Sequence, residues 1–166
     1  MSTNGTKQTL HAVVRRPEEA ERIGQGAETL SYLLTGEDTG GAFAMIERVV
    51  APNFVSPPQF HAHKADDWML YVLEGKLCLA FEDRVAELSA GSVGYVPRGT
   101  YFRWWNPEAK PARGLFLYTP ANFANFFREA IALTKLRAEK VHDYNRTLPD
   151  ILSVQDRYGM VRRPAP

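Results

Sequence analysis

The chain has 166 residues, 45% of them hydrophobic and 23% charged, which is the balance of a soluble globular protein with a sizeable core. Its formal net charge of +1 gives no electrostatic reason to expect nucleic acid or an anionic membrane as a partner. No apolar run approaches the roughly 20 residues of a membrane helix, and the N-terminus lacks the plan of a secretory signal. The single cysteine, Cys78, excludes an internal disulfide and a cysteine-based zinc site. We therefore expect a cytoplasmic protein of one domain over residues 1–166, with frayed ends at MSTNGTKQ and RRPAP.

Short apolar segments separated by Gly and Pro follow one another through the first 120 residues. The segments that predict strands are Glu28–Gly36, Ala42–Val50, Phe60–His63, Asp67–Gly75, Lys76–Phe81, Val85–Gly91, Ser92–Gly99, Thr100–Asn106 and Ala112–Pro120. Strands at this spacing predict an antiparallel sandwich or barrel, with its core over about residues 28–120.

The pattern changes after Pro120 to the spacing of amphipathic helices. Residues 122 to about 141 predict one helix, and Leu148–Gly159 predicts a second that ends at a glycine. This helical segment, about residues 121–160, is expected to pack against the outside of the barrel.

Two stretches, FHAH…LYVLEG and AGSVGYVPRG…N, resemble the two motifs of the cupin superfamily. The second motif matches at Gly91, Pro97, Gly99 and Asn106, and the first at His61, His63 and Gly75, with Val55 in place of its leading Gly. Thr35–Phe43 and Thr119–Glu129 extend the likeness to small quercetin dioxygenase-like cupins. The resemblance implies an all-β jelly-roll barrel with C-terminal helices, and a homodimer.

The resemblance also implies a metal held by His, His, Glu and His. Trp68 stands where the Glu is expected and Phe102 where the last His is expected, and neither side chain can donate a lone pair to a metal. We therefore expect no metal cofactor. The alternative is a divalent Ni, Fe, Mn or Zn ion held by His61 and His63.

Neighbouring carboxylates are weaker substitutes for the missing ligands. Asp67 points away if Trp68 points inward, because side chains alternate along a strand. Asp66 reaches the site only if it curls in from the turn, and the sequence leaves the direction of Glu47 open.

Strand alternation predicts which side chains share the interior of the barrel. The inward residues are the two histidines His61 and His63, about 6.6 Å apart along the strand, and the apolar side chains of Trp68, Leu70, Val72, Phe102 and Trp104. Such a bowl suits a flat, largely apolar ligand, such as a phenolic or polyketide-like molecule. The rival interpretation is a solid core in which both histidines are relics.

Three functions are compatible with this interior. The first is a metal-independent isomerase, cyclase, dehydratase or lyase in which His61 or His63 is the acid or base, because imidazole titrates near neutral pH. The second is a quercetinase-like dioxygenase with a reduced ligand set. The third is a binding or sensing module without catalysis.

Overall fold

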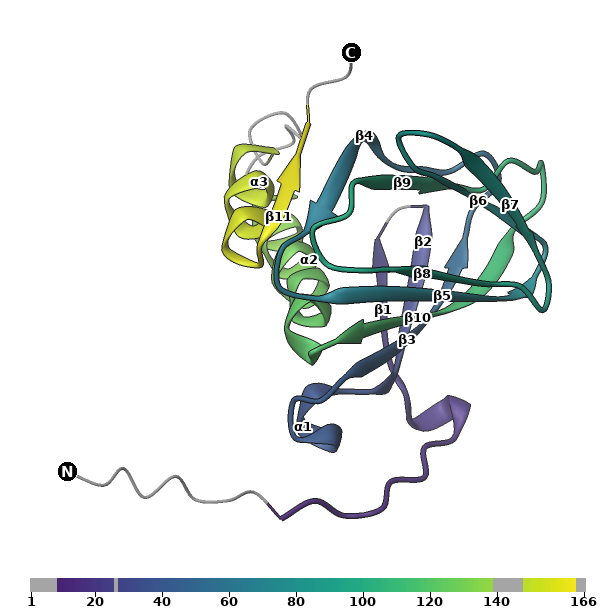
Figure 1. Cartoon of the computed structure of the whole chain (residues 1–166). Helices are drawn as coiled ribbons and strands as arrows, with labels where there is room; N and C mark the ends of the chain where they lie inside the picture. The colour runs from purple at the N-terminus through teal and green to yellow at the C-terminus, as the bar shows by residue number, and fades with distance from the viewer. Residues whose placement is uncertain (1–8, 26, 139–147, 164–166) are drawn as a thin grey trace.

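A computed structural model describes residues 9–25, 27–138 and 148–163, and these residues form two facing antiparallel sheets with helices at one end (Figure 1). The strands are β1 (Glu21–Gln25), β2 (Glu28–Leu34), β3 (Ala44–Val50), β4 (Val55–His63), β5 (Asp67–Glu74), β6 (Lys76–Ala80), β7 (Val85–Ser89), β8 (Val93–Val96), β9 (Phe102–Trp105), β10 (Ala112–Thr119) and β11 (Met160–Arg162). The helical elements are η1 (Pro17–Glu19), α1 (Gly36–Thr39), η2 (Ala121–Phe123), α2 (Ala124–Ala138) and α3 (Leu148–Arg157). The predicted all-β antiparallel fold with C-terminal helices is confirmed.

Within the described residues, the strand order is β1-β2-β3-β10-β5-β8 in the first sheet, here sheet A, and β11-β4-β9-β6-β7 in the second, sheet B. Neighbours distant in sequence, such as β3 with β10, show that the sheets are built by crossovers between the layers and not by successive hairpins alone. The inner faces of the sheets supply the hydrophobic core, to which α2 and α3 add residues from one end.

Two motif glycines lie in the turns that connect strands of sheet A to strands of sheet B. Gly75 joins β5 to β6 at φ 73°, and a Cβ there would stand 3.2 Å from Ala112 on β10. Gly99 lies at φ 82° between β8 and β9, and its N–H donates to the carbonyl of His63 at 2.7 Å. Side chains other than glycine avoid these angles, so both turns favour glycine, and the Gly99 turn is hydrogen-bonded to the histidine strand β4.

Three features depart from the sequence predictions. The GEDT stretch after Thr35 forms the single helical turn α1 and not an open turn, because Thr35 and Asp38 make a capping box. Strand β1 was not predicted. The RRPAP tail was expected to be frayed, but its first residue, Arg162, is paired with His61 in β11, and this part of the prediction is wrong.

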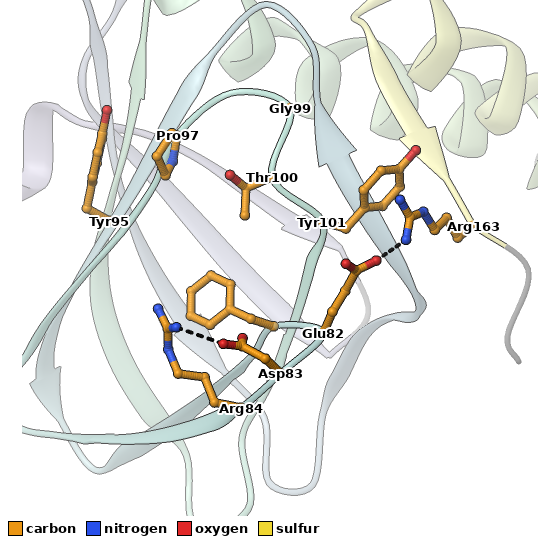
Figure 2. A pocket seen from close by; sticks show the side chains of 10 residues that line it. Glu82, Asp83, Arg84, Tyr95, Pro97, Gly99, Thr100, Tyr101 and Arg163 are labelled. Carbon is orange, nitrogen blue, oxygen red and sulfur yellow. Dashed lines mark hydrogen bonds and ion pairs between the residues drawn. The ribbon is translucent and has the colours of Figure 1, made fainter.

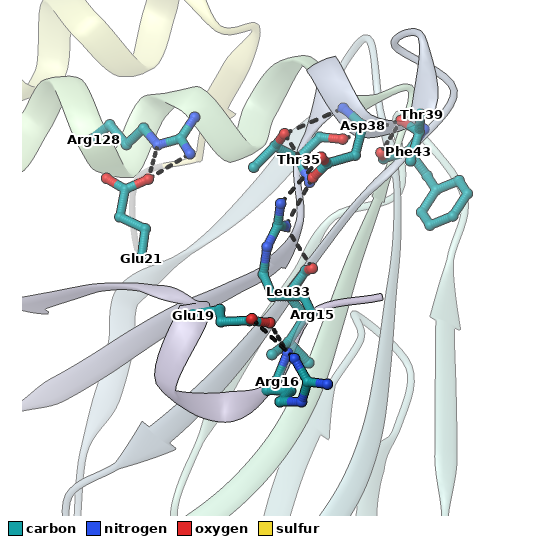
Figure 3. Close-up of polar contacts among 10 residues, drawn as sticks. All are labelled: Arg15, Arg16, Glu19, Glu21, Leu33, Thr35, Asp38, Thr39, Phe43 and Arg128. Carbon is teal, nitrogen blue, oxygen red and sulfur yellow. Dashed lines mark hydrogen bonds and ion pairs between the residues drawn. The ribbon is translucent and has the colours of Figure 1, made fainter. Parts of the chain in front are cut away.

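Ion pairs tie the N-terminal segment and the helices to the strands (Figure 3). Arg15 donates to both carboxylate oxygens of Asp38, at 2.8 and 3.1 Å, and to the carbonyl of Leu33 at 2.7 Å. Arg128 on α2 donates to Glu21 on β1 at 2.6 Å, which fixes the start of the helix against sheet A. None of the described helices is long and apolar enough to cross a membrane.

Candidate active site

The side chains that strand alternation assigned to the interior do gather there. Burial alternates along β5 and β9, with Trp68, Phe102 and Trp104 only 1–3% exposed. Leu70 and Val72 complete the wall at 0% exposure. The residues assigned to the outer face of these strands are more exposed. The prediction of which face of each strand is buried is therefore confirmed.

His61 and His63 lie side by side on β4, with ring centroids 5.6 Å apart. They are 2% and 4% exposed, so almost none of either imidazole is open to water. The Phe102 ring lies 4.3 Å from His61 and 4.8 Å from Trp68, measured between centroids. The four positions that hold the metal in the resembled family therefore converge, but two of the four carry aromatic rings that offer no lone pair to a metal.

The donor set does not fit a metal ion of that kind. Among the described residues no group of three or more His, Cys, Asp or Glu side chains is placed to hold a cation. Two imidazoles alone make fewer contacts than the three or four protein ligands of a transition-metal site. We therefore derive no chemical step through a metal.

Of the three neighbouring carboxylates, Asp67 and Glu47 are engaged outside the barrel, whereas Asp66 is buried and its Oδ2 has no hydrogen-bond partner among the described residues. Asp67 accepts hydrogen bonds from Arg98 at the surface, at 2.9 and 3.0 Å. Glu47 lies on the outer face of sheet A and pairs with Arg113 at 3.3 Å. Asp66 does turn inward and is 0% exposed, but its Oδ1 accepts the backbone N–H of Phe123 at 3.2 Å.

Burial keeps both imidazoles neutral. Loss of hydration lowers the pKa of His61 to about 3; a backbone contact with Gln59 opposes this shift, whereas the positive charges of Arg162 and Arg48 add to it. Loss of hydration also lowers the pKa of His63 to about 3, with a further contribution from His61. The Nδ1 atom of each ring is buried and has no hydrogen-bond partner among the described residues. Each ring therefore offers a neutral nitrogen inside the barrel.

A buried ion pair that was not predicted from the sequence lies against the aromatic residues of the interior. Arg48 on β3 is 3% exposed and donates to Glu28 on β2 at 2.5 Å. Its guanidinium lies over the Trp104 and Phe116 rings, 4.9 and 4.7 Å from their centroids. Burial is the largest single influence on the pKa of Arg48 and acts to lower it, but Glu28 and Tyr118 together outweigh burial and the net direction is upward. The alternation of β3 could have identified Arg48 once Glu47 was known to face outward.

The C-terminal helices cover the histidine end of the barrel. In Figure 1, α2, α3 and β11 gather beside β4. The Phe123 ring of η2 lies 3.9 Å from the His63 ring, and Phe127 of α2 lies 4.9 Å from the Arg48 guanidinium. Burial raises the pKa of Asp66, which receives the Phe123 N–H, although that hydrogen bond works in the opposite direction. The helical segment was expected on the outside of the barrel, but these aromatic residues enter its core.

A separate cavity of about 550 Å³ lies on the surface between the β6–β7 turn, the β8–β9 turn and the end of β11 (Figure 2). Arg84 pairs with Asp83, and Arg163 pairs with Glu82 across the cavity. The charges on its rim are thus already balanced, and none of the interior residues named above lines it.

The family assignment rests on the motif strands. Residues 47–118 match the family described as cupin domain, and this range includes every interior residue that the sequence analysis predicted. This part of the chain is therefore similar to a cupin domain. No curated protein sequence matches this chain closely enough to add a relative with an assigned role.

Solved cupin structures share the fold at low sequence identity. The polyketide cyclase RemF from Streptomyces resistomycificus has a TM-score of 0.55 at 22% identity, over 66% of this chain and 80% of RemF. The nucleoside dehydratase Pac13 from Streptomyces has a TM-score of 0.51 at 13% identity, over 66% and 83% of the two chains. Ectoine synthase from P. lautus has a TM-score of 0.59 at 14% identity, over 93% and 92%. These similarities show the cupin fold; the quercetin dioxygenase-like subtype and the dimer stay predictions.

Proposed function

We propose that this cupin is an enzyme that performs metal-independent acid–base chemistry on a small planar molecule held inside the barrel. The observation that carries the proposal is the pair of buried neutral imidazoles with unpartnered Nδ1 atoms. A buried polar group without a partner costs about 1–3 kcal/mol. An apolar pair at the same positions would avoid that cost, so the histidines are best explained by a ligand that they contact.

The similar structures support a reaction of this general type. RemF is described as a polyketide cyclase and Pac13 as a nucleoside dehydratase. Ring closure and loss of water both depend on moving protons to and from a bound organic molecule. For this chain we accordingly propose an isomerisation, cyclisation, dehydration or lyase reaction on a polyketide-like or phenolic substrate.

The two histidines differ in their electrostatic surroundings. Positive charge from Arg162 and Arg48 acts on His61, whereas among the described residues the only titratable neighbour that shifts the pKa of His63 is His61, which repels a proton on His63 only when it is itself protonated. A proton arriving on His63 therefore meets less repulsion. We assign His63 as the general base and His61 as the group that orients the substrate.

The walls supply the contacts for a flat ligand. Trp68 and Phe102 are adjacent rings on two facing sheets, and Phe116 lies between Trp68 and Trp104, with centroids 5.6 and 5.2 Å away. Aromatic contacts contribute about 0.5–1.5 kcal/mol each beyond area burial. Since these rings are almost fully buried, a ligand reaches them only when covering residues move. We propose that η2 and the start of α2 provide this movement, because Phe123 rests directly on His63.

The test uses 2-tetralone, a flat ketone with acidic C–H groups next to its carbonyl. In D₂O, a general base removes the C–H proton and deuterium replaces it, which proton NMR follows directly. The protein should accelerate this exchange over buffer, and His63→Gln should slow the catalysed exchange by about 10²–10⁴-fold. His61→Gln should mainly raise the concentration of 2-tetralone that gives half-maximal exchange.

Quenching of tryptophan fluorescence provides the matching measure of binding. His63→Gln should retain the quenching by 2-tetralone, because the aromatic wall is intact. If neither exchange nor quenching occurs with the parent protein, the histidines are relics in a solid core and the proposal fails.

A further inference from the structure

Arg162, His61 and Phe102 form one row across sheet B. His61 on β4 pairs with Phe102 on β9 on one side and with Arg162 on β11 on the other. Paired residues of antiparallel strands point to the same face, and neighbouring strands lie about 4.8 Å apart. The Arg162 side chain therefore leaves the sheet on the face that carries the histidines.

Met160 supports this direction. It lies two residues before Arg162 on the same strand, pairs with His63 and is only 6% exposed within the core. Residues 160 and 162 share one face because side chains alternate along a strand. Arg162 thus extends the site by one strand, at the edge of the barrel where α3 packs.

Arg162 differs from its neighbours in having no carboxylate partner among the described residues. Arg157 pairs with Glu129 and Arg163 with Glu82, but Arg162 makes no such pair, and its Nε is buried without a hydrogen-bond partner. Burial lowers the pKa of Arg162, which the charge of Asp156 opposes without a direct contact. The second arginine near His61, Arg48, is already neutralised by Glu28.

We infer that Arg162 is the specificity-determining residue of the site and binds a carboxylate of the substrate beside His61. This inference rests on the proposed function and narrows its substrate to flat molecules that carry a carboxylate. The guanidinium fork matches the two oxygens of a carboxylate, and a partly buried guanidinium without a partner gains most from one. Neutral His61 neither repels the carboxylate nor competes for the guanidinium.

The experiment compares 2-naphthoate with 2-naphthamide, which has the same ring system and no charge. Binding of each is followed by quenching of tryptophan fluorescence. The parent protein should bind the carboxylate at least about tenfold more tightly than the amide, as hydrogen bonds between charged groups allow. Arg162→Gln should abolish this preference by weakening naphthoate alone, and Arg162→Lys should restore part of it.

Arg163→Gln is the matched control, because it removes the adjacent arginine from the surface side of the strand end. It should keep the parental preference. If the parent binds both probes equally, or if Arg162→Gln weakens both equally, the role of Arg162 is overturned while the ligand site of the barrel stands. If 2-tetralone exchange is also absent and neither probe binds, both the site and the role of Arg162 are overturned.

Discussion

Replacing both buried histidines should flatten the dependence of stability on pH between pH 7 and pH 5. The folded pKa of each is about 3, against an ordinary value of 6.5. In this interval the two histidines bind protons in the unfolded chain but not in the folded chain, so the free energy of unfolding falls as the pH falls. The loss begins near pH 6.5 and ends near pH 3.

The magnitude follows from the two pKa values. Between pH 7 and pH 5, proton binding stabilises the unfolded state by about 2 kcal/mol for each histidine and by about 4 kcal/mol for the pair. Asp66 acts in the opposite direction, because its folded pKa is raised. A comparison of variants that all keep Asp66 isolates the part that belongs to the histidines.

The assay is urea unfolding of the parent, of His61→Gln/His63→Gln and of each single variant, at pH 7, 6 and 5. Each single variant should lose about 2 kcal/mol less stability than the parent between pH 7 and 5, and the double variant about 4 kcal/mol less. Any constant cost of the substitution cancels, because only the change with pH is compared. His11→Gln, at an exposed position, controls for the removal of an imidazole. Parallel pH profiles for parent and double variant would refute buried, neutral histidines.

Three further predictions concern the rest of the site. Parent protein made without a His tag should carry well under one divalent ion per chain by elemental analysis, and stoichiometric metal would revive the dioxygenase interpretation. The double variant Trp68→Glu/Phe102→His completes the ligand set of the resembled family and should bind nickel or zinc stoichiometrically. Glu28→Gln should destabilise the protein by about 3–5 kcal/mol in urea unfolding, because it leaves the buried Arg48 charge unpaired, and a loss below 1 kcal/mol would contradict the assigned burial. Trp68→Ala should lower stability by about 3–5 kcal/mol, since it empties a packed aromatic position, and an unchanged urea midpoint would mean that the interior is open to solvent.

The motif strands show how far strand alternation alone can reach. It placed His61 with His63, and Trp68 with Leu70 and Val72, on the inner face, because the period of two follows directly from strand geometry. The motif glycines were also predictable, since they mark turns that require positive φ angles. Two missing metal ligands could be identified from spacing within the motifs, without any knowledge of how the strands pair.

The features that can be predicted from the amino-acid sequence are therefore local: the positions of the strands, the face on which each side chain lies, and the lack of metal-binding atoms at Trp68 and Phe102. Which distant strands meet follows from the three-dimensional fold. It paired Arg162 with His61 across about 100 residues of chain and joined Arg48 to Glu28, and it brought Phe123 onto His63. These contacts follow from the order of strands in the sheets and from the docking of η2 and α2. The strand order and the docking of these helical segments both depend on burial of the whole apolar core, and this burial cannot be predicted from any single segment of the sequence.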